Sequence, residues 1–356
     1  MKNINVLLAS ISFALSILIG LVISQSGGSG DETTGKKLVI GLSMDTLQEA
    51  RWKVDRDLFV ERAESLGAEV KVNSANSDDS VQLRDVNSFI SNKVDVIVII
   101  PHDGAAMAKG VENAHEAGIP VIAYDRLITD TELDLYVTFN NVRVGEVQAQ
   151  YLVDTLGGKG NIVRIYGAPT DNNAKLFKQG QDNVLQPYID RGDIKVVHED
   201  WATGWQPQIA KQITNAAITN NGHDFVGILA SNDGTAGGAI QALKEEGLAG
   251  KIIVTGQDAE LAATQRIVDG AQAMTIYKPV KTLATQAAEY AVKLAKGKPF
   301  VAQHELHNGH SMVPSVFLPV TAVDKNNIQD TVIADGFHSF EDVYRNVPED
   351  QRPAKK

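Results

Sequence analysis

The chain of 356 residues contains no cysteine. This absence excludes disulfide bonds, thiolate metal sites, thiol nucleophiles and lipid attachment through cysteine. Blocks of positive charge are also missing: 33 Lys and Arg residues stand against 44 Asp and Glu residues, for a formal net charge of -11 at pH 7. We therefore expect no nucleic acid among the partners, because such binding needs clustered basic residues. The sequence also has no GxSxG motif, no phosphate-binding loop and no G-x-G-x-x-G after a strand, which disfavours the enzyme classes that depend on them.

Only one long apolar run occurs, and it lies at the N-terminus. Lys2 precedes an apolar stretch from Val6 to Ile23, which is typical of a secretory signal peptide. The stretch is also close to the length of about 20 residues that spans a bilayer, so an uncleaved anchor stays open. Residues 25–36 are rich in Gly and Ser and predict a flexible tether. We expect an exported protein, periplasmic or tethered to the outer face of the cytoplasmic membrane, with residues 1–24 as signal peptide or anchor.

From Lys37 onward, strand and helix patterns alternate with short connections. The stretch from Val96 to Ile100 is an unbroken β-branched run, the pattern of a strand buried on both faces of a parallel sheet. Pro101 ends this strand, and a helix closed by Gly118 leads to the next strand. A chain of this length is too long for one ordinary core, and the βα pattern starts over after residue 140. The sequence predicts an α/β protein with two doubly wound parallel-sheet, Rossmann-like lobes.

Polar residues follow the predicted strands in both halves. Asp125 and Arg126 come directly after the strand that ends at Tyr124, and similar clusters occur at residues 171–173, 231–233 and 256–258. In open α/β sheets, ligands bind at the carboxyl ends of the strands. We therefore expect a ligand site in the cleft between the two lobes.

Six segments of the chain carry a family resemblance in order. They read EARW (49–52), AYDR (123–126), PTDNNAK (169–175), ASNDGTAGG (230–238), GQDA (256–259) and YKP (277–279). Together they resemble the pentose/hexose-binding family of periplasmic proteins that serve ABC transporters. The resemblance extends from Lys37 to about His338, whereas the long apolar N-terminus and the tether depart from the family pattern.

The resemblance implies a type I periplasmic-binding-protein architecture with a hinge that the chain crosses three times. We place these crossings near Phe139–Asn140, near Lys278–Pro279 and after His310. The N-terminal lobe then comprises residues 37–139 plus 279–312, and the C-terminal lobe residues 140–278 plus 313–345. A final strand from Val316 to Val320 would belong to the C-terminal lobe, and residues 346–356 would form a polar tail.

The resemblance also implies a function. The protein would capture D-xylose or a close monosaccharide in the cleft, close by hinge motion and deliver the sugar to an ABC transporter permease. The alternative is a ligand-binding subunit of a sugar-sensing receptor system with a membrane sensor as partner. We expect a monomer, no cofactor and no enzymatic activity.

A pyranose suits the residue types of these segments. Adjacent hydroxyls can be held in pairs by planar Asp, Asn and Arg groups, and the C–H faces of the ring can stack on aromatic side chains. Trp52 and Trp205 would enclose the ring from opposite lobes. Three cations would balance the carboxylates, which favours a neutral ligand over a phosphorylated one. By resemblance, the ligand-binding residues are Arg51, Trp52, Asp125, Arg126, Asn173, Trp205, Asn232, Asp258 and Lys278.

Several of these positions have alternative readings. Trp201 competes with Trp205 as the stacking residue, and Asn172 competes with Asn173. Asp125 and Arg126 could form a structural salt bridge, Trp52 could pack in the core, and Asn232 could serve only as a helix cap. Asp125 and Asp258 could also be an acid/base pair acting on a glycoside, but the flanking cations should keep both carboxylates ionised.

Two patterns suggest metal ions without matching a known site. His304, His307 and His310 recur every third residue, but Gly309 disfavours a helix, so we interpret them as surface histidines of a crossover segment. The stretch 324–330 lacks the glycine and the distal glutamate of a calcium loop, so we interpret it as a turn. We predict no metal site.

Overall fold

The computed structural model describes residues 37–356, of which Leu38–Lys356 form one compact unit. The apolar stretch Val6–Ile23 and the predicted tether at residues 25–36 lie outside the described residues. Within the described part, no helix combines the length and the hydrophobicity that crossing a bilayer requires.

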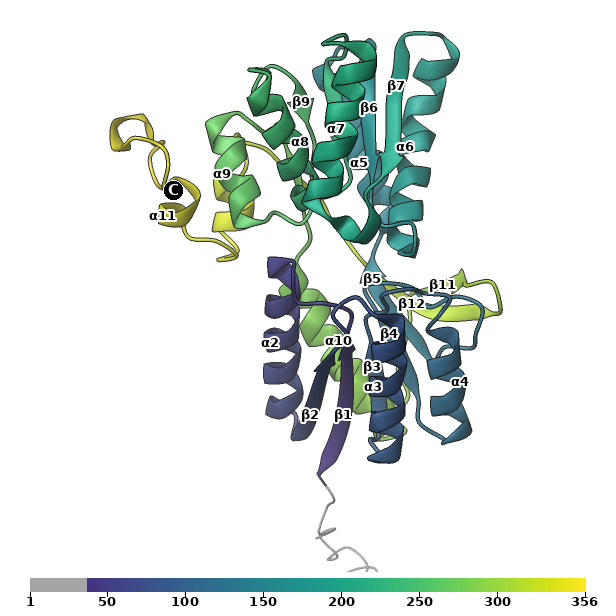
Figure 1. Ribbon diagram of the computed structural model, residues 1–356. Coiled ribbons are helices and arrows are strands. Elements are labelled where there is room, and N and C mark those ends of the chain that lie inside the picture. The colour runs from purple at the N-terminus through teal and green to yellow at the C-terminus, as the bar shows by residue number, and fades with distance from the viewer. Residues whose placement is uncertain (1–36) are drawn as a thin grey trace, which may run out of the picture. The chain divides into compact units, whose positions relative to one another are not determined.

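One sheet has seven strands in the order β11-β12-β5-β4-β3-β1-β2 (Figure 1). All neighbouring strands are parallel except β11 and β12, which form an antiparallel hairpin at one edge. We call this sheet and the four helices packed on it the first lobe. Its elements are β1 (Leu38–Met44), α2 (Ala50–Ser65), β2 (Ala68–Ser74), α3 (Asp79–Ser91), β3 (Val96–Ile99), α4 (Ala108–Glu116), β4 (Val121–Tyr124), β5 (Leu135–Phe139), α10 (Val280–Ala295), β11 (His304–His307) and β12 (Met312–Leu318).

The buried strands of this sheet send alternate side chains to two separate cores. Val96 and Val98 pack in the core that α2 and α10 cover, whereas Ile97 and Ile99 pack in the core that α3 and α4 cover. Both faces of β3 are therefore apolar, which explains its unbroken β-branched run.

A second sheet, with the order β7-β6-β8-β9, is parallel throughout. A separate antiparallel pair, β10 and β13, lies beside it, and we call these strands and their helices the second lobe. The short helix α11 packs against α9 (Figure 1). The elements are α5 (Asn141–Thr155), β6 (Gly160–Tyr166), α6 (Asn172–Asp190), β7 (Ile194–Trp201), α7 (Pro207–Asn221), β8 (Gly227–Ala230), α8 (Asp233–Glu245), β9 (Ile253–Val254), α9 (Leu261–Asp269), β10 (Thr275–Tyr277), β13 (Thr321–Val323) and α11 (Phe340–Val343), with shorter helical turns at Thr203–Trp205, Gln329–Ile333 and Glu349–Gln351. Two largely parallel sheets between helices confirm the predicted fold class.

The third passage between the lobes differs from the prediction. β12 pairs with β5 in the first sheet, and the chain reaches the second lobe only between Leu318 and Thr321. The predicted strand over 316–320 in the C-terminal lobe, and the predicted boundary at residue 313, are therefore wrong. Val316 and Leu318 pack in the core of the first lobe, and Pro319, which has no N–H to donate, ends the strand there. The other passages follow β5, after Phe139, and β10, after Tyr277.

Two helices of the second lobe begin with a capped N-terminus. The side chain of Asp171 accepts a hydrogen bond from the N–H of Asn173 at the start of α6. Asn232 and Thr235 form a reciprocal capping box at the start of α8. These caps fix where two of the predicted ligand-binding segments begin.

Candidate functional site

All nine residues predicted to bind a ligand line one cavity. The cavity has an empty volume of about 320 Å³, part of which is open to solvent. Four further residues line it that the prediction did not include. They are Glu49, Asp171, Phe177 and Gln257.

Each lining segment follows a strand or begins a helix. Arg51 and Trp52 lie in the first turn of α2, whereas Asp125 and Arg126 directly follow β4. In the second lobe, Asn173 begins α6, Asn232 precedes α8, and Lys278 directly follows β10. The carboxyl ends of parallel strands from two sheets thus meet at one cleft, which is the ligand-binding edge in this fold class.

Arg51 is the centre of an ion-pair network that joins the lobes. Its guanidinium lies 2.8 Å from Asp125, 3.2 Å from Asp55 and 3.3 Å from Asp258. The side chain is only 5% exposed, so these three carboxylates replace the water that a guanidinium otherwise binds. Asp55 also accepts a hydrogen bond from the buried hydroxyl of Tyr124. The contact between Arg51 and Asp258 connects the first lobe to the second.

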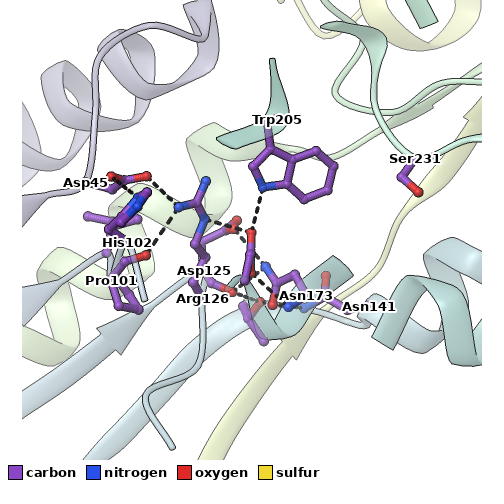
Figure 2. Close-up of polar contacts among 12 residues, drawn as sticks. Asp45, Pro101, His102, Asp125, Arg126, Asn141, Asn173, Trp205 and Ser231 are labelled. Atoms are coloured by element: carbon purple, nitrogen blue, oxygen red, sulfur yellow. Dashed lines mark hydrogen bonds and ion pairs between the residues drawn. The ribbon is translucent and has the colours of Figure 1, made fainter. Parts of the chain in front are cut away.

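Arg126 forms a second connection between the lobes. It lies 2.6 Å from Asp45 at the end of β1 and 2.9 Å from Asp171 of the second lobe, and it donates to the carbonyl of Pro101. His102 holds the other oxygen of Asp45 at 2.9 Å (Figure 2). Asp125 and Arg126 therefore do not form a salt bridge with each other; each pairs with separate residues of the cleft.

Asp171 contacts three groups of the site at once. One carboxylate oxygen accepts the backbone N–H of Asn173, and the other accepts the indole N–H of Trp205 at 3.1 Å and contacts Arg126. Asp171 lies within one of the six family segments, but it was not among the nine predicted ligand-binding residues. Its position directly before a predicted helix in the second lobe was the signal that could have identified it.

Asn173 connects the backbone and side chain of Asp125 to the second lobe. Its amide nitrogen donates to the carbonyl oxygen of Asp125 at 3.0 Å and to the carboxylate at 3.1 Å (Figure 2). Its amide oxygen accepts a hydrogen bond from Asn141 at 2.9 Å. Asn172 occupies the first turn of the same helix and does not line the cavity.

The two cleft tryptophans come from opposite lobes. Trp52 lies beneath two guanidinium groups, with Arg51 4.2 Å and Arg126 5.2 Å from its ring centroid. Trp205 is 8% exposed and lines the cavity, whereas Trp201 packs on Tyr166 with ring centroids 4.9 Å apart. The structure thus brings Trp205, and not Trp201, to the cleft.

Asn232 combines the two roles that the sequence left open. Its amide oxygen caps α8 through the N–H of Thr235 at 2.8 Å, and its side chain also lines the cavity. Because the oxygen faces the helix, the amide nitrogen is the group available for another acceptor.

Three cleft residues have backbone conformations that are rare outside glycine. The φ angles are 59° at Asp125, 58° at Trp205 and 97° at Asp258. Aspartate tolerates this left-handed region better than most residues, but tryptophan does not. Strained backbone of this kind is concentrated at functional sites, where the surrounding structure compensates for it.

The pKa of Asp125 bears on the interpretation of this residue as a catalytic acid or base. Burial raises the pKa of Asp125, but the charges of Arg51 and Lys278 outweigh it and leave the pKa below its ordinary value. A general acid needs the opposite shift, which disfavours the acid/base interpretation of this residue. The predicted charge balance was also incomplete, because Asp45, Asp55 and Asp171 pair with the same cations.

The two sequence patterns that suggested metal ions, the histidines at 304–310 and the stretch 324–330, lie outside the cleft. His304 and His307 are exposed on β11, and the imidazole of His304 stacks on Phe317 at 5.0 Å. They belong to an edge hairpin and not to a crossover segment. The carboxylate of Asp324 accepts the N–H of Asn326, and the side-chain oxygen of Asn327 accepts the N–H of Asp324, so this stretch is a turn, as interpreted from the sequence. Among residues 37–356, no group of three or more His, Cys, Asp or Glu side chains is arranged to hold a metal ion.

The fold and the site together define the class of protein to which the chain belongs. Two α/β lobes with three connecting passages, and a polar cleft lined by one tryptophan from each lobe, are the features of a solute-binding protein that closes on its ligand. The family described as "Periplasmic binding protein domain" matches residues 40–299, and the chain belongs to this family. Its members bind solutes and are not enzymes.

Named relatives agree with this class. The chain is 49% identical over 336 residues to a D-xylose-binding periplasmic protein of Haemophilus influenzae, covering 94% of this chain and 99% of the relative. It is 50% identical over 303 residues to a D-xylose-binding periplasmic protein of Escherichia coli, covering 85% and 92%. Among solved structures, a carbohydrate transporter solute-binding protein of Chloroflexus aurantiacus in complex with D-glucose matches with a TM-score of 0.81 and 36% identity, covering 86% of this chain and 98% of that chain.

Proposed function

We propose that this protein captures D-xylose in the cleft between its lobes and delivers it to the permease of an ABC transporter. The observation that carries the proposal is a cavity in which groups of both lobes converge, with nine residues of the types that hold a neutral polyol. The names of the two relatives with 49% and 50% identity supply the sugar.

The chemistry of the cleft fits a pyranose. Arg51, Lys278 and Asn173 carry donors for the ring and hydroxyl oxygens, and Asp258 carries acceptors for hydroxyl protons. Trp52 and Trp205 supply flat apolar surfaces from opposite lobes. We propose all nine cavity residues of the predicted set as the sugar contacts.

The ion pairs of Arg51 with Asp258 and of Arg126 with Asp171 hold the lobes together across the cleft. We propose that these pairs stabilise a closed state, which a permease distinguishes from the open one. We propose an exported monomer, periplasmic or tethered to the outer face of the cytoplasmic membrane, and the periplasmic relatives support its export. The sugar-sensing alternative uses the same binding step, and nothing in residues 37–356 favours it over transport.

The test is calorimetric titration of the chain from Lys37 onward, which contains the compact unit Leu38–Lys356. The ligands are D-xylose, D-ribose, L-arabinose, D-glucose and D-galactose. The proposal predicts one-to-one binding with D-xylose tightest. Tighter binding of another sugar would change the assignment of the ligand. The absence of binding heat with every sugar would reject the sugar-binding function.

A further inference from the structure

Two buried oxygen atoms of cavity residues lack a hydrogen-bond partner in the described part of the chain. They are Oε2 of Glu49 and Oε1 of Gln257. Glu49 belongs to the first lobe and Gln257 to the second, and neither was among the nine predicted contacts. Buried polar groups are almost always hydrogen-bonded in native proteins, so each of these atoms requires an explanation.

The orientation of the Gln257 amide is fixed by its nitrogen. The side chain is 2% exposed, and Nε2 donates to the carbonyl oxygen of Ser231 at 3.2 Å. Rotating the amide by half a turn would place its oxygen against that carbonyl oxygen, which is repulsive. Oε1 therefore remains an unpaired acceptor on a residue that lines the cavity.

Glu49 has the position of a helix cap but does not cap its helix. It precedes α2 with extended backbone, and its side chain accepts no hydrogen bond from that helix, unlike Asp171 and Asn232, which cap theirs. Instead, Glu49 lines the main cavity and also an adjoining opening that includes Trp205 and Glu260. Burial raises the pKa of Glu49, as expected for a carboxylate with little solvation.

Acceptors are otherwise scarce in this cleft. Both oxygens of Asp125 are engaged, one by Arg51 and the other by Asn173. One oxygen of Asp258 receives both Arg51 and Lys278. A sugar hydroxyl must donate one proton as well as accept, so a cleft rich in cations needs further acceptors.

We propose that Glu49 and Gln257 each accept a hydrogen bond from a hydroxyl of the bound sugar, one from each lobe. The inference rests on the proposed function and extends it to the basis of specificity. A ligand that lacks either hydroxyl leaves a buried acceptor unpaired and is rejected. These contacts would also favour closure, because each lobe reaches the same ring.

The test measures coupling between a protein group and a ligand hydroxyl. Glu49→Met and Gln257→Met remove the acceptors while keeping side-chain length. Each variant is titrated with D-xylose and with the series of monodeoxy-D-xyloses, beside the wild type. Glu61→Met, at an exposed position of α2, and Gln208→Met, at an exposed position of α7, are matched controls.

We expect the wild type to bind one deoxy sugar about tenfold or more weakly for each of the two contacts. Gln257→Met should lose about tenfold for D-xylose and should no longer distinguish D-xylose from one deoxy sugar. Glu49→Met should behave in the same way toward a different deoxy sugar. The controls should retain wild-type affinities and the wild-type discrimination.

A variant that merely disturbs the structure would weaken D-xylose and every deoxy sugar by the same factor, and that result would overturn the inference. Unchanged D-xylose affinity in both variants would also overturn it. If Gln257→Met does not fold, the Glu49→Met comparison at the less buried position decides. If the wild type binds none of the sugars, the proposed function fails and this inference fails with it. Wild-type binding without coupling rejects the inference alone.

Discussion

Replacing Asp258 by asparagine removes a negative charge from the cleft while keeping a side chain of nearly the same size. Among residues 37–356, Asp258 is the only carboxylate that forms an ion pair with Lys278, at 2.8 Å, and it also contacts Arg51 at 3.3 Å. Asparagine, unlike alanine, tolerates the φ angle of 97° at this position, so the backbone should keep its conformation.

The expected loss of stability follows from the burial of Lys278. This side chain is 3% exposed, and removing one partner of a buried pair costs about 3–5 kcal/mol because the other charge is left uncompensated. Arg51 keeps Asp55 and Asp125, and the asparagine oxygen still accepts one hydrogen bond. We therefore expect the lower end, about 3 kcal/mol, in the free energy of unfolding at pH 7.

Sugar affinity should fall independently of stability. Two charge-assisted contacts position Asp258, and losing its charge should weaken D-xylose binding about 100-fold. The double variant Asp258→Asn/Lys278→Met removes the buried ammonium as well. It should recover all but about 1 kcal/mol of stability, since a neutral pair replaces a buried ion pair at little cost, but it should not recover binding.

Urea unfolding and calorimetric titration measure the two quantities. Asp269→Asn, at the exposed end of α9, is the control and should change the free energy of unfolding by less than about 0.5 kcal/mol. The reasoning would be refuted if Asp258→Asn bound D-xylose within about threefold of the wild type. Restored binding in the double variant would also refute it.

Three further perturbations test other parts of the site. Asp171→Asn keeps a capping side chain but removes the charge paired with Arg126, so D-xylose affinity should fall about tenfold. Asp171→Ala also removes the cap, so calorimetry should show a larger loss of affinity. Equal losses in the two variants would contradict the capping role. Gly167→Ala adds a Cβ that would overlap the indole of Trp205, so tryptophan emission should shift and sugar binding should weaken; an unchanged spectrum would contradict this packing. Burial raises the pKa of Glu260 from 4.5 to about 8, so the folded chain holds a proton that the unfolded chain releases, and stability should fall as pH rises from about 4.5 to about 8. Urea unfolding at pH 5 and at pH 9 measures this fall in the free energy of unfolding, and Glu260→Gln should make it smaller. An equal fall in the variant and the wild type would contradict the raised pKa of Glu260.

Much of the fold could be predicted because strand and helix signals agree locally. The β-branched run at β3 and the glycine at position 118 specify a buried strand and a helix end without reference to distant residues. The assignment of β12 could not be made in this way. Its neighbours β5 and β11 are chosen by tertiary pairing, and the break at Pro319 was hidden within a hydrophobic run.

The candidate site also contains residues that local sequence patterns identify and residues that only tertiary contacts identify. The nine predicted residues came from the family resemblance, and the rule that ligands bind at strand ends explains why most of them lie together. The same rule applied to β1 would have identified Asp45, which directly follows that strand. Asp55 lies one turn beyond Arg51 on α2, and its role depends on the approach of Asp125, which no local pattern specifies.

The most direct test of the account is a crystal structure of the protein grown with D-xylose. We expect a pyranose in the cavity between Trp52 and Trp205, with hydroxyls within hydrogen-bond distance of Asp258 and Asn173 and with the lobes closed around it. An empty cavity at saturating D-xylose, or a sugar bound elsewhere on the protein, would contradict the claim that this cleft is the sugar site.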